Sequence, residues 1–216
     1  MAPRLRLVLA SNNAGKLAEL RSLFAPLPLD LVAQPSLGVA EAEEPHATFI
    51  ENALAKARHA AAATGLAAIA DDSGLCVDAL GGAPGVYSAH YADLDLPAGV
   101  AIDREDRRAR QDAANNAKLL AALDGAATRR ARFVCALVAV RTAGDPEPLI
   151  AFGRWDGEIL TAPQGDGGFG YDPLMFIPAQ GCTAAAMPAE TKNRLSHRAL
   201  ASAQMLALMR EVWQRG

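Results

Sequence analysis

The sequence predicts an α/β protein, because strand-like and helix-like segments follow one another along the chain. Residues 4–10 alternate between polar and apolar side chains and then become fully apolar, which is typical of a strand that enters a sheet. After the polar run at 11–15, the apolar residues from 17 to 24 recur at helical spacing. The opening unit is therefore a strand, a polar loop and a helix.

The next unit is a helix followed by a second strand. A capping box at Thr48 and Glu51 begins a helix with one apolar face. The apolar residues 66–70 then form a segment short enough for a buried strand. We expect this strand to end at Asp71 and Asp72, so that two carboxylates lie together at a strand end.

Turn residues and changes of period divide the rest of the chain. We expect a Gly- and Pro-rich loop at 81–91, a charged mobile excursion or lid at 93–111, a helix at 115–123, a strand at 133–139, a hairpin-style pair at 149–154 and 155–160, a glycine-rich loop at 165–173, a strand at 174–177 and a final helix after Ser196. The length favours one domain over residues 1–216, either undivided or built as two intimately joined lobes.

The composition favours a protein with an apolar core, and the cysteine pattern favours a reducing compartment. Hydrophobic residues make up 51% of the chain, and a chain of this size buries about 70% of its unfolded surface without disulfides or structural metals. Cys76, Cys135 and Cys182 lie far apart, with none of the spacings of a zinc site. No charge-free apolar run reaches the length of about 18 residues that spans a membrane. We therefore expect a soluble, cytoplasmic protein.

The charge balance argues against a nucleic-acid polymer as partner. The chain has 21 basic and 24 acidic residues, a formal charge of −3, and no basic run. Only four basic residues are lysines: Lys16, Lys56, Lys118 and Lys192. Because an ammonium is a compact point charge suited to a phosphate oxygen in a tight loop, each is either a phosphate-binding candidate or a plain surface charge.

The segment from Ser11 to Lys16 is a candidate phosphate-binding loop. It joins a strand to a helix and contains two asparagines, a glycine and a lysine, so backbone N–H groups and the positive end of a helix would face an anion. Its spacing is not that of a Walker loop. An ordinary strand-to-helix turn with an exposed lysine is the alternative.

Carboxylates further along the chain are candidate metal ligands. Besides Asp71 and Asp72, a short acidic loop offers Glu43 and Glu44, and Mg²⁺ prefers one or two carboxylates with waters and substrate phosphates. Adjacent strand residues point to opposite faces, so only one of the two aspartates is expected to face a metal while the other braces the turn. Solvated acids in a turn are the alternative.

Two further segments are candidates for holding a base or a phosphate. Residues 192–198 gather Lys, Arg, His and Arg ahead of a helix that Ser196 would cap, with His197 and Arg198 projecting outward from its first turn. Phe169 lies in a glycine-rich loop, where its ring is suited to stacking on a base. A charged helix flank and an apolar plug are the alternatives.

Five blocks, taken together, resemble one family in order and spacing. They are SNNAGKLAEL at 11–20, TFIENALAKA at 48–57, ADDSGLCVDALGGAPGVYSAHYA at 70–92, GGFGYDP at 167–173 and KNRLSHR at 192–198. On these blocks, which span nearly the whole chain, the sequence resembles the RdgB/Ham-type non-canonical purine NTP pyrophosphatases (dITP/ITP/XTP pyrophosphatases). The resemblance implies a two-lobed α/β fold around a long mixed β-sheet, ITPase-like (Maf/Ham-type), with the active site in the inter-lobe cleft and a homodimer as the usual form.

The resemblance also implies an activity and its residues. Family members hydrolyse ITP, dITP and XTP to the monophosphate and pyrophosphate with Mg²⁺, which removes deaminated purines from the nucleotide pool. Carried over by position, Asp72 would be the general base, and Glu44 and Asp72 would hold the metal, with Lys56 and Asp71 as possible support. The residues implied to bind the nucleotide are Ser11, Asn12, Asn13, Ala14, Gly15, Lys16, Ser73, Phe169, Gly170, Tyr171, Asp172, Lys192, His197 and Arg198.

These implied roles agree with the chemistry of the reaction. Lys16 and Lys192 would offset charge on the leaving pyrophosphate, while Asp72 would orient or deprotonate the water that attacks the α-phosphorus. A donor such as Arg198 would pair with the 6-oxo group of a deaminated purine and leave the amino group of adenine unpaired. A Maf-like pyrophosphatase for other modified or pyrimidine nucleotides and a nucleotide-binding module without hydrolysis are the competing interpretations.

Overall fold

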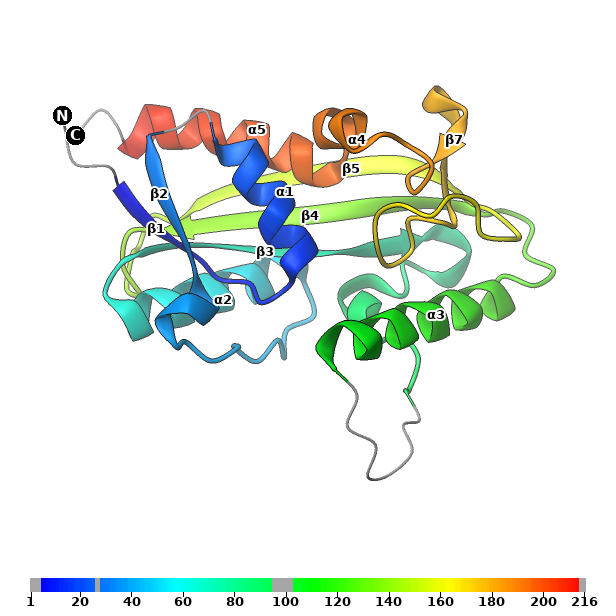
Figure 1. Ribbon diagram of the computed structural model, residues 1–216, viewed down its shortest axis with the longest axis horizontal. Helices are drawn as coiled ribbons and strands as arrows, with labels where there is room; N and C mark the ends of the chain where they lie inside the picture. The colour runs from blue at the N-terminus through cyan, green and yellow to red at the C-terminus, as the bar shows by residue number, and fades with distance from the viewer. Residues whose placement is uncertain (1–4, 26–27, 95–102, 214–216) are drawn as a thin grey trace. The chain divides into compact units, whose positions relative to one another are not determined.

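The computed structural model is an α/β protein and describes residues 5–25, 28–94 and 103–213 (Figure 1). Its main elements are β1 (Leu5–Leu9), α1 (Ala14–Phe24), β2 (Leu29–Ala33), α2 (Phe49–Thr64), β3 (Ala67–Val77), α3 (Arg104–Ala122), β4 (Arg130–Val140), β5 (Leu149–Ile159), β6 (Met175–Ile177), β7 (Cys182–Thr183), α4 (Ala189–Leu195) and α5 (His197–Leu208). Short 3-10 helices lie at Gln34–Leu37, Asp78–Leu80, Gly85–His90 and Pro178–Gln180, and a π-helical turn lies at Met209–Trp213. Across the described ranges, no helix is both long and apolar enough to span a bilayer.

A single mixed sheet connects the strands in the order β2-β1-β3-β4-β5-β6-β7. β1 pairs in parallel with both β2 and β3, whereas β5 with β6 and β6 with β7 pair antiparallel. The α/β class and the mixed sheet are therefore confirmed. β2, which pairs Asp30 with Arg6 of β1, lies in a stretch to which the sequence pattern assigned no strand.

The chain divides into two compact units. The first comprises Met1–Ser73, Val134–Arg154 and Asn193–Gly216, and the second comprises Gly74–Phe133 and Trp155–Lys192. β3, β4 and β5 each contribute residues to both units.

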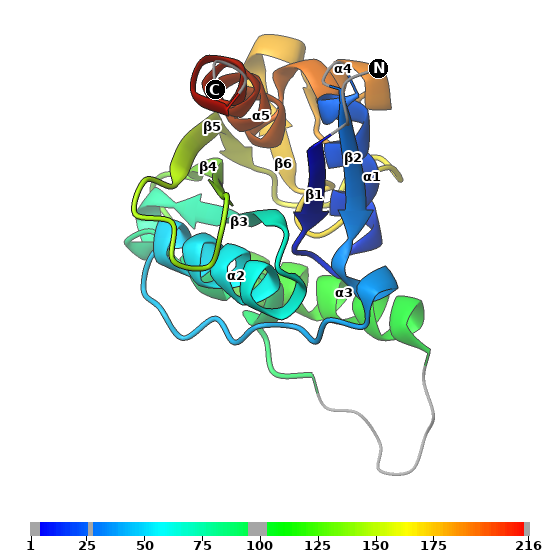
Figure 2. The ribbon, with the colours of Figure 1, turned by 90° about the vertical axis from the view of Figure 1, so that its left-hand side faces the viewer.

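In the first unit, helices cover both faces of the sheet, with α1 and α5 on one face and α2 on the other (Figure 2). Ile69 of β3 lies in an apolar cluster with residues of α1 and α5, whereas its neighbours Ala68 and Ala70 lie in a cluster with residues of α2. This alternation follows from the two-residue period of a strand. By the same period, Asp71 belongs to the face of α1 and α5, and Asp72 belongs to the face of α2.

Side-chain caps begin the helices of the first unit. Asn13 caps α1 by accepting a hydrogen bond from the Lys16 N–H at 3.1 Å. Thr48 caps α2 and bonds to the Glu51 carboxylate at 2.6 Å, so the predicted capping box is confirmed. Ser196 caps α5, also as predicted. Each cap satisfies N–H groups that have no partner within the helix.

Two predicted strand boundaries are wrong. β3 does not end at Asp71 and Asp72 but continues to Val77, so both carboxylates lie inside a strand. β5 is one strand from Leu149 to Ile159 rather than a hairpin-style pair, and its side chains alternate between buried and exposed without interruption from 149 to 156. In both cases pairing with neighbouring strands, which is non-local, continues the strand past residues that locally favour a turn.

The predicted helix at 115–123 begins earlier. α3 starts at Arg104, because the Asp103 carboxylate accepts hydrogen bonds from the N–H groups of Glu105 and Asp106 at 2.9 Å each. The described part of the excursion predicted at 93–111 is therefore largely helical. Residues 95–102 of that prediction lie outside the described residues.

A close approach between β5 and α5 requires glycine at position 153. A Cβ atom there would lie 1.8 Å from the His197 carbonyl oxygen and 2.7 Å from the Ala201 amide nitrogen. We expect Gly153→Ala to lower the free energy of unfolding by about 2 kcal/mol or more, because the backbone must shift. Denaturant titration checks this, with Gly144→Ala as the control because nothing lies within 4 Å of a Cβ there. Equal stability of the two variants would contradict the expectation.

Candidate functional site

The loop between β1 and α1 is shaped by hydrogen bonds from its own side chains. The Ser11 hydroxyl accepts from the Asn13 N–H at 3.2 Å, and the Asn13 side chain in turn accepts from the Lys16 N–H. Gln34 donates to the Asn12 side-chain oxygen at 3.2 Å. The strand, loop and helix predicted from the sequence are confirmed, and Lys16 lies in the first turn of α1, at the positive end of its dipole.

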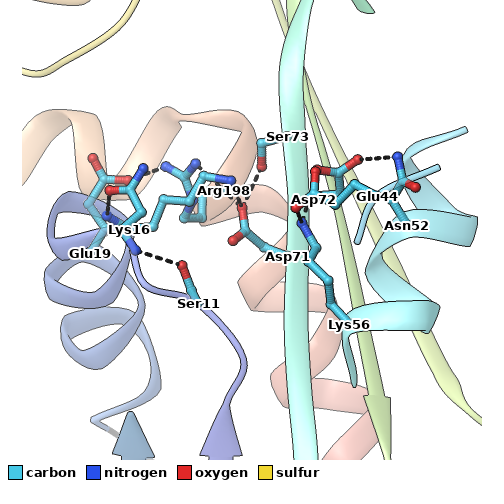
Figure 3. Close-up of polar contacts among 11 residues, drawn as sticks. Ser11, Lys16, Glu19, Glu44, Asn52, Lys56, Asp71, Asp72, Ser73 and Arg198 are labelled. Carbon is cyan, nitrogen blue, oxygen red and sulfur yellow. Dashed lines mark hydrogen bonds and ion pairs between the residues drawn. The ribbon is translucent and has the colours of Figure 1, made fainter. Parts of the chain in front are cut away.

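Asp71 lies among cations from α1 and α5. Its Oδ2 is 3.0 Å from Lys16 Nζ and 3.7 Å from Arg198 Nη2, and it accepts the Ser73 hydroxyl at 2.7 Å (Figure 3). Burial alone would raise the pKa of Asp71, but Lys16 and Arg198 outweigh it and hold that pKa well below its ordinary value. An ionised carboxylate therefore anchors the Lys16 ammonium.

Arg198 is buried, so the prediction that it projects outward is wrong. Its exposed fraction is 2%, and its guanidinium pairs with Glu19 of α1 as well as with Asp71. Burial alone would lower the pKa of Arg198, but the two carboxylates raise it above its ordinary value. The prediction is also wrong for His197, which is buried beside it. A buried guanidinium is tolerated here because partners from two other elements compensate its charge.

Asp72 faces α2. Its Oδ1 lies 3.1 Å from Lys56 Nζ, and its Oδ2 accepts from Asn52 Nδ2 at 3.3 Å. The same Lys56 ammonium lies 2.8 Å from Glu44 Oε1, so one cation joins two carboxylates (Figure 3). Burial raises the pKa of Asp72 above its ordinary value although Lys56 acts against it. The expectation that the consecutive aspartates point to opposite faces is confirmed.

The carboxylates of Glu44 and Asp72 suit a hard divalent cation. Oxygens from both lie within 3.1 Å of the Lys56 ammonium nitrogen, so the two carboxylates lie close together and share that one cation. Within the described ranges, no three His, Cys, Asp or Glu side chains are grouped to hold a metal. Two carboxylates are nevertheless sufficient for Mg²⁺ when substrate phosphates and waters complete the coordination.

The glycine-rich loop forms a second polar cluster, within the second unit. Asp172 Oδ2 accepts the Phe169 N–H at 2.9 Å and lies 2.7 Å from Lys192 Nζ. The Lys192 ammonium also lies 4.9 Å from the centre of the Phe169 ring, a distance at which cation–π attraction operates. Gly168 has φ +73°, and a Cβ there would lie 2.1 Å from Asp172 Oδ2, so only glycine permits this approach.

Tyr171 links two segments of the second unit through a hydrogen bond. Tyr171 is 5% exposed, and its hydroxyl donates to the Ser88 carbonyl oxygen at 2.9 Å. Burial raises the pKa of Tyr171 above its ordinary value. The phenol therefore stays protonated and ties the glycine-rich loop to the 3-10 helix at Gly85–His90.

The predicted site residues thus fall into two clusters, one in each unit. The first unit contains Ser11, Asn12, Asn13, Ala14, Gly15, Lys16, Glu44, Lys56, Asp71, Asp72, Ser73, His197 and Arg198, and the second contains Phe169, Gly170, Tyr171, Asp172 and Lys192. Sequence reasoning missed Glu19 and Asn52. Asn52 and Lys56 are four residues apart on the otherwise apolar face of α2, and this spacing of buried polar side chains was the available signal.

Comparison with known proteins finds close relatives. The family model described as Ham1 family matches residues 7–208. The dITP/XTP pyrophosphatases of Leptothrix cholodnii and Methylibium petroleiphilum are 71% and 72% identical to the chain, each over 97% of the chain and 99% of the relative. A HAM1 protein from Coxiella burnetii is 41% identical with a TM-score of 0.84, over 96% of this chain and 100% of that one. A nucleoside-triphosphatase / dITP/XTP pyrophosphatase from Mycobacterium abscessus is 41% identical with a TM-score of 0.68, over 94% and 99%.

Proposed function

Because the chain belongs to the Ham1 family, we propose that it is a nucleoside triphosphate pyrophosphatase. It hydrolyses dITP, XTP and ITP to the nucleoside monophosphate and pyrophosphate, and so removes deaminated purines from the nucleotide pool. The names of its relatives support this substrate class. Within the chain itself, the observation that best supports the proposal is that the carboxylates of Glu44 and Asp72 both pair with the Lys56 ammonium.

Asp72 is the general base of the proposed reaction. The oxygen of a water forms a bond to the α-phosphorus, the bond from that phosphorus to the bridging oxygen breaks, and pyrophosphate leaves. The water proton passes to Asp72, whose two oxygens are already held by Lys56 and Asn52. Lys16, at the positive end of α1, stabilises negative charge on the polyphosphate.

Mg²⁺ is the proposed cofactor, with Glu44 and Asp72 as its protein ligands. When bound, the ion supplies positive charge to the polyphosphate oxygens. The donor set supports the choice, because carboxylate oxygens are hard ligands. The Glu44 side chain is 41% exposed, so its carboxylate is open to solvent and to an arriving metal-bound nucleotide.

The remaining contacts to the nucleotide are proposed on chemical grounds. The Phe169 ring offers a π-face to a base, and Lys192 offers an ammonium to a phosphate. Ser73, His197 and Arg198 are also proposed to contribute to nucleotide binding. A homodimer and a cytoplasmic location are further parts of the proposal.

A pyrophosphate-release screen over all natural and deaminated triphosphates tests the function. We expect dITP, XTP and ITP to turn over at least about a hundredfold faster than ATP, because a site that pairs with a 6-oxo group leaves polar groups unpaired against an amino group. Chelation of Mg²⁺ is expected to abolish release, and added Mg²⁺ to restore it. Faster turnover of dTTP or UTP would indicate a Maf-like enzyme instead. Absence of pyrophosphate from ITP with excess Mg²⁺ would indicate a non-hydrolytic nucleotide-binding module.

A further inference from the structure

The glycine-rich loop of the second unit is held by α3, which contains none of the candidate site residues. Asp112 Oδ2 accepts the Gly170 N–H at 2.9 Å, and Asn116 Nδ2 donates to the Gly170 carbonyl oxygen at 3.0 Å. Two helix residues four apart therefore hold both backbone polar groups of one loop residue. Arg108, one turn earlier, lies 4.9 Å from the centre of the Phe169 ring and 4.0 Å from Asp112.

These contacts select one conformation of a segment that would otherwise have many. Gly170 has φ +64°, in the left-handed region, where glycine is permitted but loses much conformational freedom on ordering. The next residue back, Phe169, is bonded through its N–H to Asp172. The peptide that carries the aromatic ring is thus fixed by Asp172 at one end and by α3 at the other.

We propose that Asp112 is a positioning residue for nucleotide binding. Through the Gly170 N–H it holds the Phe169 ring in the orientation that receives the base, with Asn116 bonding to the carbonyl oxygen of the same residue. This inference rests on the proposed function, because it takes the ring to contact the nucleoside. Asp112 itself touches no reacting atom, so its loss weakens substrate binding and leaves the chemical step intact.

The test is Asp112→Ala, measured against dITP. We expect KM to rise about tenfold, equivalent to about 1.4 kcal/mol, while kcat stays within about twofold of the wild type. Asp112→Asn keeps an oxygen that can accept the Gly170 N–H, and its KM should stay near the wild-type value. Asp106→Ala makes the same chemical change at an exposed position of the same helix and serves as the control.

Two further measurements separate positioning from a general structural effect. Inorganic tripolyphosphate has no base, so its inhibition constant should be the same for wild type and Asp112→Ala. Amide hydrogen exchange over residues 167–172 should be faster in Asp112→Ala, and this readout requires no activity.

Several results would overturn the inference. The first is an unchanged KM, or an unchanged hydrogen exchange rate, in Asp112→Ala. The second is a rise in KM for Asp112→Asn as large as that for Asp112→Ala. The third is an inhibition constant for tripolyphosphate that rises in Asp112→Ala together with KM. A wild-type protein that releases no pyrophosphate from dITP would instead refute the proposed function, and the exchange measurement would still test the hold of α3 on the loop.

Discussion

Asp72→Asn is expected to lower kcat for dITP by about a thousandfold, in the middle of the range for loss of a general base, with a much smaller change in KM. The amide keeps the shape of the carboxylate and one acceptor oxygen for Lys56 or Asn52, but it lacks the negative charge and cannot accept the proton of the attacking water. Steady-state pyrophosphate release at saturating dITP measures the effect.

Asp30→Asn is the matched control for this variant. Asp30 lies on β2 of the same unit, pairs with Arg6 at 3.7 Å, and has a side chain that is 59% exposed. The same chemical change there should leave kcat unaltered. If Asp72→Asn kept near wild-type turnover, Asp72 would have no part in the proton transfer.

Lys16→Ala is expected to lower kcat/KM for dITP by about a hundredfold or more, as loss of one charge-stabilising donor does in other active sites. The same change should destabilise the fold, because the buried Asp71 would lose the nearer of the two cations that pair with it. Removal of one partner from a buried ion pair costs about 3 kcal/mol. Pyrophosphate release and denaturant titration report the two effects separately.

A double variant distinguishes the two tasks of Lys16. Asp71→Asn removes the charge that Lys16→Ala would leave uncompensated and retains an oxygen for the Ser73 hydroxyl. The combined variant should therefore regain most of the lost stability without regaining activity. Recovery of activity together with stability would show that Lys16 acts only on the fold.

Local chemistry made part of the site predictable. The caps at Thr48 and Ser196 are signalled by residues within three positions of each helix start, and the structure has both. The loop before Lys16 is signalled by its turn-forming residues. The division of Asp71 and Asp72 between opposite faces follows from strand geometry alone, which needs no knowledge of the fold.

Features that depend on distant partners were not predictable in the same way. The local sequence at Asp71 and Asp72 is typical of a strand end. β3 nevertheless continues, because neighbouring strands pair with it in the sheet and because Lys16 and Lys56 compensate the two buried charges. Arg198 reads as a solvent-facing residue, but it is buried because Glu19 and Asp71 meet it from other elements. Charge compensation by residues far away in sequence cannot be read from spacing.

The role assigned to α3 was hidden for a related reason. Arg108, Asp112 and Asn116 recur every four residues in a segment so rich in charge that its polar residues resemble any solvated helix face. Their common partner, the loop at Phe169 and Gly170, lies more than fifty residues further along the chain. The pairing becomes visible only once the fold brings the two together.

The alternation along β3 also constrains how this stretch of the gene can change. Asp71 and Asp72 are adjacent in the chain and point to opposite faces of β3. An insertion or deletion of one residue between Ala67 and Asp71 would therefore turn each side chain to the other face of the sheet. Asp72, the proposed proton acceptor, would then face Arg198, and Asp71 would face Lys56. We therefore expect a one-residue insertion or deletion here to disrupt the contacts of both aspartates.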